Sequence, residues 1–167
     1  PTDDRVLLLA AFAAAVEDKP DLSLRYLKRL ERSYYAMESA WACHAIALAQ
    51  MGRWPQAKSL AEEHNLIVIE DASHAHGATY DDRRVGSIGH IGCFSLQGSK
   101  PVTGGEAGII TTDDTELYER ILILGHYGRI AKDLVTDKYR DLHNIGLGIK
   151  YRAHPLACAM ANVQLKR

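Results

Sequence analysis

Residues 66–80 read LIVIEDASHAHGATY, and the character of the chain changes at the start of this stretch. The run 66–69 is continuous, apolar and rich in β-branched residues, which predicts a buried strand. Asp71 follows closely, and in open α/β sheets ligands bind beyond the carboxyl ends of the strands. Asp71 is therefore a candidate site residue, although an aspartate in this place is more often a turn former or a helix cap.

The sequence downstream alternates between apolar runs and amphipathic stretches. Short apolar runs at 91–96 and 108–112 predict two further strands, buried and mostly parallel. Amphipathic helices are expected at 116–124 and at 155–166, the second with a proline in its first turn. Residues 64–167 are thus predicted to form an α/β unit.

The sequence upstream, residues 1–63, is predicted to be an α-helical segment. It is rich in Ala, Leu, Arg, Lys and Glu, with a single glycine between residues 6 and 63, and its apolar residues recur at helical spacing. Breaks at 18–21 and 51–55 divide it into three or four helices. Residues 40–61, AWACHAIALAQMGRWPQAKSLA, resemble a tetratricopeptide-type hairpin, and a generic helical hairpin is an equal alternative.

Composition excludes several classes of protein. At 167 residues the chain can form one compact domain with a core, but not two full enzyme domains. The net charge of -1, with both signs spread along the chain, leaves no basic footprint for nucleic acid or an anionic membrane.

The longest apolar stretch, 6–16, is too short to span a bilayer and lacks the flanks of a signal peptide, so a cytoplasmic protein is expected. The three cysteines form no C-x-x-C pair, which argues against a disulfide framework or a zinc knuckle.

Ser95 and Lys100 are a second pair of candidate site residues. Both lie in FSLQGSK, residues 94–100, where the Gln-Gly-Ser between them must form a loop. The loop brings a hydroxyl and an amine near each other, so that Ser95 can hold a phosphate while Lys100 forms an imine. A lysine taken alone is nearly always a solvated surface charge. The glycine-rich stretch 103–108 does not open a helix and is no dinucleotide-binding fingerprint.

His74 and His76 lie in the loop after Asp71, where an imidazole can pack on a flat ring or hydrogen-bond a phenolic oxygen. A His-x-His pair near an aspartate can also chelate a cation. No third ligand follows at a fixed spacing, however, and His90 belongs to a different loop. No metal site is expected.

Three linked motifs carry a resemblance to a known family. EDASHAHGATY (70–80), VGSIGHIGCFSLQGSK (85–100) and TGGEAGIITTDD (103–114) occur in this order. Together they resemble the central block of the DegT/DnrJ/EryC1/StrS aminotransferases. The resemblance implies part of the large domain of a fold-type I transferase that uses pyridoxal 5'-phosphate. The family's N-terminal phosphate loop is not recognisable in residues 1–63, and its C-terminal small domain is not expected after residue 167.

The resemblance also implies roles for individual residues. Asp71 would hold the pyridine nitrogen, His74 would lie against the ring or its phenolic oxygen, and Ser95 would bind the phosphate. Lys100 would form the imine with the cofactor, and a lysine here implies amino transfer, because dehydratase relatives carry histidine. Residues 148–167, GIKYRAHPLACAMANVQLKR, resemble the segment that reaches a neighbouring subunit's cofactor, where Lys150 would bind phosphate across a homodimer interface.

The predicted function is therefore the transfer of an amino group from a donor such as glutamate to a nucleotide-linked ketosugar. Lys100 would act as acid and base in the proton shift that completes the transfer. The alternative is a shortened, inactive relative that acts as a binding or assembly protein through its helical N-terminus. Convergence of Lys100, Asp71 and Ser95 on one site would favour the aminotransferase hypothesis, and wide separation would favour the binding or assembly hypothesis.

Overall fold

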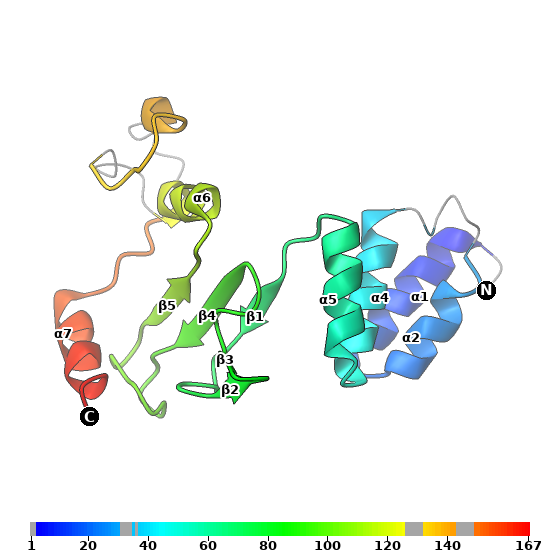
Figure 1. Cartoon of the computed structure of the whole chain (residues 1–167), viewed down its shortest axis with the longest axis horizontal. Helices are drawn as coiled ribbons and strands as arrows, with labels where there is room; N and C mark the ends of the chain where they lie inside the picture. The colour runs from blue at the N-terminus through cyan, green and yellow to red at the C-terminus, as the bar shows by residue number, and fades with distance from the viewer. Residues whose placement is uncertain (1–2, 31–34, 36, 126–131, 143–148) are drawn as a thin grey trace. The chain divides into compact units, whose positions relative to one another are not determined.

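A computed structural model describes residues 3–30, 35, 37–125, 132–142 and 149–167. The chain divides into two compact units, residues 1–68 and residues 69–167. The described elements of the first unit are all helices, whereas the second unit combines strands with helices (Figure 1). The α/β character predicted for the second part of the chain is therefore confirmed.

The N-terminal unit contains helices α1 (Asp4–Val16), α2 (Pro20–Leu27), α4 (Glu38–Gln50) and α5 (Trp54–Glu63). Asp3 caps α1 by accepting a hydrogen bond from the backbone N–H of Arg5 at 2.9 Å. Prolines stand in the first turn of α2 and of α5, where a backbone N–H would have no helical partner. The two predicted breaks are confirmed, because Asp18 and Gly52 adopt positive φ between helices.

The core of this unit is built mainly from small side chains. Ala11, Leu27, Ala40 and Cys43 are buried together and join three helices. The buried Ser23 hydroxyl donates a hydrogen bond to the carbonyl of Ala11 at 2.8 Å, which ties α2 to α1. Helices α4 and α5 pack together as a hairpin, but its identity as a tetratricopeptide-type repeat is not confirmed.

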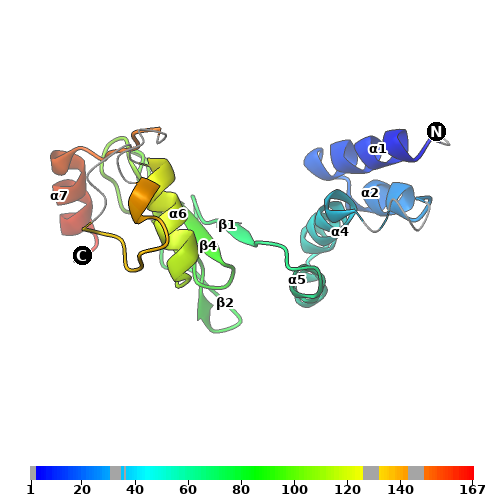
Figure 2. The same ribbon diagram turned by 90° about the horizontal axis from the view of Figure 1, so that it is seen from above.

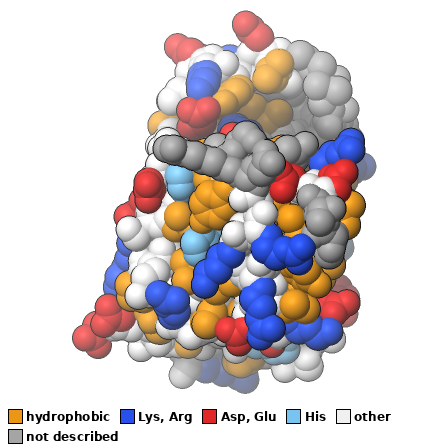
Figure 3. All heavy atoms as spheres, turned by 90° about the vertical axis from the view of Figure 1, so that its right-hand side faces the viewer, with side chains coloured by type: hydrophobic (Ala, Val, Ile, Leu, Met, Phe, Trp, Pro, Cys, Tyr) orange, Lys and Arg blue, Asp and Glu red, His pale blue; other side chains and the backbone are white. Residues whose placement is uncertain are grey.

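Helix α1 packs through one face and leaves another uncovered. Its buried residues are Leu7, Ala11, Ala14 and Ala15. A row of larger apolar side chains at three- and four-residue spacing is exposed instead: Val6, Leu9, Phe12 and Val16. Figure 3 likewise shows hydrophobic side chains, in orange, between Lys and Arg side chains on the molecular surface.

The C-terminal unit is organised around a three-stranded sheet of order β1-β4-β5. Its strands are β1 (Ile69–Asp71), β4 (Ile91–Ser95) and β5 (Gly108–Thr111). β1 is parallel to β4, but β5 is antiparallel to β4. The prediction of mostly parallel strands is wrong for β5, because the chain returns from β4 through a closed loop without the crossover that a parallel strand requires.

The expected position and burial of the first strand also need correction. β1 begins at Ile69, three residues later than predicted, because the Leu66 N–H donates to the carbonyl of Ala61 and extends the end of α5. Ile69 is 62% exposed and Ile110 of β5 is 53% exposed. Among the described residues both strands lie at the edges of the sheet, so their apolar side chains are covered less than those of a central strand.

The remaining elements surround this sheet. β2 (Thr79–Tyr80) and β3 (Arg83–Arg84) form a hairpin, and α6 (Thr115–Gly125), a 3-10 turn (Arg140–Leu142) and α7 (Pro155–Gln164) follow β5. The predicted helices at 116–124 and 155–166 are thus confirmed. Figure 1 shows α7 on the β5 side of the sheet, and in Figure 2 α7 lies across the unit from β1. Among the described residues, no helix combines the length and the apolar character needed to cross a bilayer.

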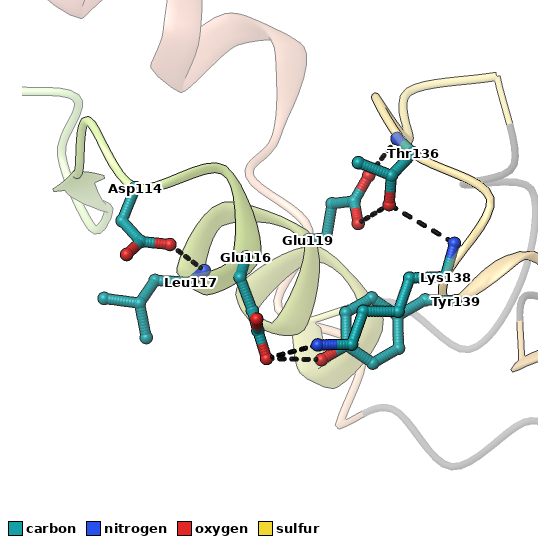
Figure 4. Close-up of polar contacts among 7 residues, drawn as sticks. All are labelled: Asp114, Glu116, Leu117, Glu119, Thr136, Lys138 and Tyr139. Atoms are coloured by element: carbon teal, nitrogen blue, oxygen red, sulfur yellow. Dashed lines mark hydrogen bonds and ion pairs between the residues drawn. The ribbon is translucent and has the colours of Figure 1, made fainter.

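Residues 132–142 are fastened to α6 by two glutamates (Figure 4). Glu119, which is only 1% exposed, accepts hydrogen bonds from the backbone N–H of Thr136 at 2.5 Å and from its hydroxyl at 2.6 Å. Glu116 forms an ion pair with Lys138 at 2.7 Å and accepts a hydrogen bond from the Tyr139 hydroxyl at 3.1 Å. These bonds lower the pKa of both carboxyls. The largest effect on Glu119 comes from the side chain of Thr136, and the largest effect on Glu116 comes from the side chain of Lys138.

This attachment is expected to loosen in acid. The two carboxyls have a lower pKa in the folded unit than the ordinary value of 4.5, so their contribution to stability is present above that value. It is lost as pH falls through the folded pKa values. Amide exchange at Thr136, measured below pH 4.5 and corrected for intrinsic exchange, is expected to accelerate. The Glu119→Gln variant should already exchange faster at neutral pH, and an identical acid response in wild type and variant would contradict the prediction.

Candidate active site

The carboxyl ends of β1 and β4 bring two predicted residues to one edge of the sheet. Asp71 is the last residue of β1 and pairs with Cys93 of β4. Ser95 is the last residue of β4. Because the two strands are parallel, Asp71 and Ser95 lie at the same edge, as expected for a ligand site in an α/β sheet.

Asp71 presents an ionised carboxylate at this edge. Its Oδ1 atom accepts hydrogen bonds from the hydroxyl of Ser73 at 2.5 Å and from the backbone N–H of Ser73 at 3.0 Å. These bonds lower the pKa of Asp71, and the charges of His74 and Lys100 lower it further. Ser73 was not predicted, although an aspartate followed two residues later by a serine is a common local turn.

Lys100 lies against His74, 26 residues earlier in the chain. The Nζ atom of Lys100 is 2.9 Å from Nε2 and 3.2 Å from Nδ1 of the imidazole. Lys100 is half-buried, whereas His74 is exposed at the surface. The amine and the imidazole are therefore in contact, and both lie near enough to Asp71 for their charges to lower the pKa of its carboxyl.

Lys100 is carried by a loop that closes on itself between β4 and β5. At its base the carbonyl of Leu96 accepts hydrogen bonds from the N–H of Gly104 at 2.9 Å and from the hydroxyl of Thr103 at 3.1 Å. Gln97 forms an isolated bridge with Gly105 just inside this base. We call residues 96–105 the lysine loop.

Helix α7 packs against the base of the lysine loop. A Cβ atom on Gly104 would lie 2.9 Å from the carbonyl oxygen of Ala157, which is closer than real contacts allow. The side chain of Met160 lies near Gly105. Glycine at 104 is thus required by the approach of the helix, and this requirement accounts for part of the glycine-rich stretch.

Glu70 is a second residue that sequence reasoning missed. Successive side chains of a strand point to opposite faces, so Glu70 points away from the face of Asp71. Its carboxylate accepts three backbone hydrogen bonds, each 2.7 Å long, from Gly86, Ile88 and Gly89. Glu70 therefore fixes the loop before β4, and no local sequence pattern signals this role.

Two other predicted residues lie apart from this group. The ring of His76 packs on Phe94, with centroids 5.6 Å apart, and its two buried nitrogens have no partner among the described residues. Lys150 is exposed, with a φ of 62°. Its neighbours Ile149 and Tyr151 donate hydrogen bonds of 2.7 Å to the last turn of α6, so Lys150 lies beside that turn and not in the lysine loop.

The chain is similar to a family of enzymes and to several of its named members. The DegT/DnrJ/EryC1/StrS aminotransferase family matches residues 45–167. A UDP-4-amino-4,6-dideoxy-N-acetyl-beta-L-altrosamine transaminase of Campylobacter jejuni is 37% identical over 109 residues, which are 65% of this chain and 28% of the relative. A GDP-perosamine synthase of Caulobacter vibrioides is 38% identical over 108 residues, 65% of this chain and 27% of the relative.

Solved structures give the same result. An aminotransferase from Psychrobacter cryohalolentis superimposes with a TM-score of 0.57 at 39% identity, covering 68% of this chain and 31% of that structure. A Helicobacter pylori aminotransferase involved in the biosynthesis of pseudoaminic acid has a TM-score of 0.56 at 27% identity, with 67% and 29% covered. The chain thus spans between 27% and 31% of the length of these four proteins.

Proposed function

Because the chain belongs to the DegT/DnrJ/EryC1/StrS aminotransferase family, we propose that it forms part of an enzyme that uses pyridoxal 5'-phosphate to aminate a ketosugar. The observation that carries the proposal is the grouping of the Lys100 amine, the His74 imidazole and the ionised Asp71 carboxylate. The names of the relatives support a nucleotide-linked sugar as the acceptor. Glutamate is proposed as the amino donor.

The side chains at this edge of the sheet fit the proposed cofactor. The amine of the half-buried residue Lys100 suits its aldehyde, and an ionised aspartate suits a protonated pyridine nitrogen. His74 offers a flat ring, and Ser95 offers a hydroxyl for the phosphate. When bound, pyridoxal 5'-phosphate supplies an electron sink for the charge that develops on the substrate carbon.

Lys100 is the proposed proton carrier of the reaction. Its Nζ atom would take a proton from the α-carbon of the amino donor. It would then give a proton back to complete the amino transfer. His74 holds this amine in the site through their 2.9 Å contact. Asp71, kept ionised by Ser73, holds the ring nitrogen in its protonated form.

The proposal includes a second copy of the chain. Residues 148–167 resemble the family segment that reaches a neighbouring subunit's cofactor. Lys150 is exposed, and its ammonium group is suited to a phosphate of the neighbouring copy's cofactor. A homodimer is therefore the proposed working form.

The experiment that tests this function follows the first half of the reaction. The folded chain is incubated with pyridoxal 5'-phosphate and glutamate, and 2-oxoglutarate is measured against the amount of protein. About one equivalent per chain is expected without an acceptor, because the cofactor must be regenerated before a second turnover. Cofactor binding without any 2-oxoglutarate would contradict transfer from glutamate and would favour the alternative of a binding or assembly protein.

A further inference from the structure

The lysine loop contains a smaller turn that is organised by one side chain. The backbone carbonyl of Gln97 accepts a hydrogen bond from the N–H of Lys100 at 2.9 Å. The side-chain Oε1 of Gln97 accepts two more, from the N–H of Ser99 at 2.9 Å and from the hydroxyl of Ser99 at 2.6 Å. Gln97 thus binds both residues that end the turn, although all of residues 97–99 are exposed to solvent.

The same glutamine links this turn to the phosphate side of the proposed site. Its backbone N–H donates a hydrogen bond to the hydroxyl of Ser95 at 3.3 Å. Its bridge with Gly105 holds the opposite strand of the lysine loop. Gln97 therefore contacts the backbone on both sides of Lys100 and the hydroxyl proposed to hold phosphate.

Ordering an exposed side chain against its own turn costs conformational entropy, and the hydrogen bonds of that side chain must offset this cost. Ordering each backbone residue costs roughly 1–2 kcal/mol of conformational entropy, and short exposed turns are usually mobile unless something holds them. In the described part of the chain, the bonds of the Gln97 side chain all involve its oxygen and none involves its amide nitrogen. The acceptor oxygen is therefore the feature of Gln97 that this turn uses.

We propose that Gln97 is a positioning residue that fixes the 97–100 turn and so holds the Lys100 amine beside His74 before the cofactor arrives. This inference rests on the proposed function, because the benefit of the fixed amine is faster and tighter capture of an aldehyde. Gln97 itself does not contact the amine of Lys100. Its effect on capture passes through the backbone of the turn.

Two variants test whether the turn depends on the acceptor oxygen of Gln97. Gln97→Leu removes the acceptor, whereas Gln97→Glu keeps it and can still receive both bonds from Ser99. Each protein is titrated with pyridoxal 5'-phosphate, reduced with borohydride, and the modified Lys100 peptide is quantified by mass spectrometry. Gln97→Leu is expected to require about tenfold more cofactor, which corresponds to about 1.4 kcal/mol, and Gln97→Glu should stay within about threefold of wild type.

Amide hydrogen exchange without cofactor supplies an independent readout. The N–H groups of Ser99 and Lys100 are expected to exchange about tenfold faster in Gln97→Leu and at nearly the wild-type rate in Gln97→Glu. The melting temperature should be unchanged in both variants, because residues 97–99 are exposed. A purely structural role would lower the melting temperature instead.

The two readouts distinguish failure of this inference from failure of the proposed function. If wild type is not modified at Lys100, the proposed function is wrong. The hydrogen-exchange rates of Ser99 and Lys100 then still test whether Gln97 fixes the turn. If exchange is the same in Gln97→Leu and wild type, Gln97 does not fix the turn. If exchange accelerates while the cofactor requirement stays the same, the turn does not position Lys100, and the inference is wrong.

Discussion

Replacing Lys100 with alanine is expected to remove the borohydride-fixed pyridoxal 5'-phosphate from the protein and to lower the production of 2-oxoglutarate from glutamate by a factor of roughly 10²–10⁴ or more. The reason is that one amine serves both as the attachment point and as the proposed proton carrier. Lys100 is also the lysine whose Nζ lies 2.9 Å from the His74 ring. Peptide mapping after reduction measures the attachment, and 2-oxoglutarate measures the proton transfer.

Lys132→Ala is the matched control for this result. Lys132 is an exposed lysine of the same unit, so its removal changes the net charge equally and leaves the sheet edge intact. Attachment and activity are expected to remain at the wild-type level in this variant. Modification of Lys132 or any other lysine in place of Lys100 would contradict the assignment of the site.

Replacing Glu70 with alanine is expected to lower the free energy of unfolding of the C-terminal unit by about 3 kcal/mol. Three backbone N–H groups lose their acceptor at once, and hydrogen bonds to a charged group are worth roughly 1.5–3 kcal/mol each but are not additive. The loop before β4 would lose its attachment to β1. Denaturant unfolding followed by far-ultraviolet circular dichroism measures the change.

Two further variants provide comparisons for the stability loss of Glu70→Ala. Glu70→Gln keeps one acceptor oxygen and is expected to lose about half as much stability as Glu70→Ala. Glu106→Ala removes an exposed carboxylate and should stay within about 0.5 kcal/mol of wild type. Equal losses in Glu70→Ala and Glu106→Ala would show that the three bonds of Glu70 contribute nothing to stability.

The local elements were predictable because their signals are local. β4, β5, α6 and α7 lie within one or two residues of the predicted runs, since hydrophobic periodicity and proline positions act over short distances. The direction of β5 was not predictable in this way. An apolar run has the same appearance in a parallel and in an antiparallel strand, and only the path of the connecting loop decides between them.

The same distinction applies to the candidate site. The linked motifs predict Asp71, His74, Ser95 and Lys100. The structure places Lys100 in contact with His74, their charges lower the pKa of Asp71, and Ser95 lies at the same sheet edge as Asp71. Their chemical roles stay predictions. The role of Glu70 was not predictable because it binds backbone groups 16 to 19 residues away, and the sequence does not reveal which distant backbone groups a side chain will meet after folding.

The way the sheet is connected also implies an order of assembly. β4 and β5 are joined by the lysine loop, so their pairing closes a short stretch of chain, from Ser95 to Gly108. β1 can pair with β4 only after a longer stretch, from Ile69 to Ile91, has been ordered. Short closures cost less entropy and form sooner, so Lys100 should reach its native position on the folding pathway before Asp71 and His74 join it.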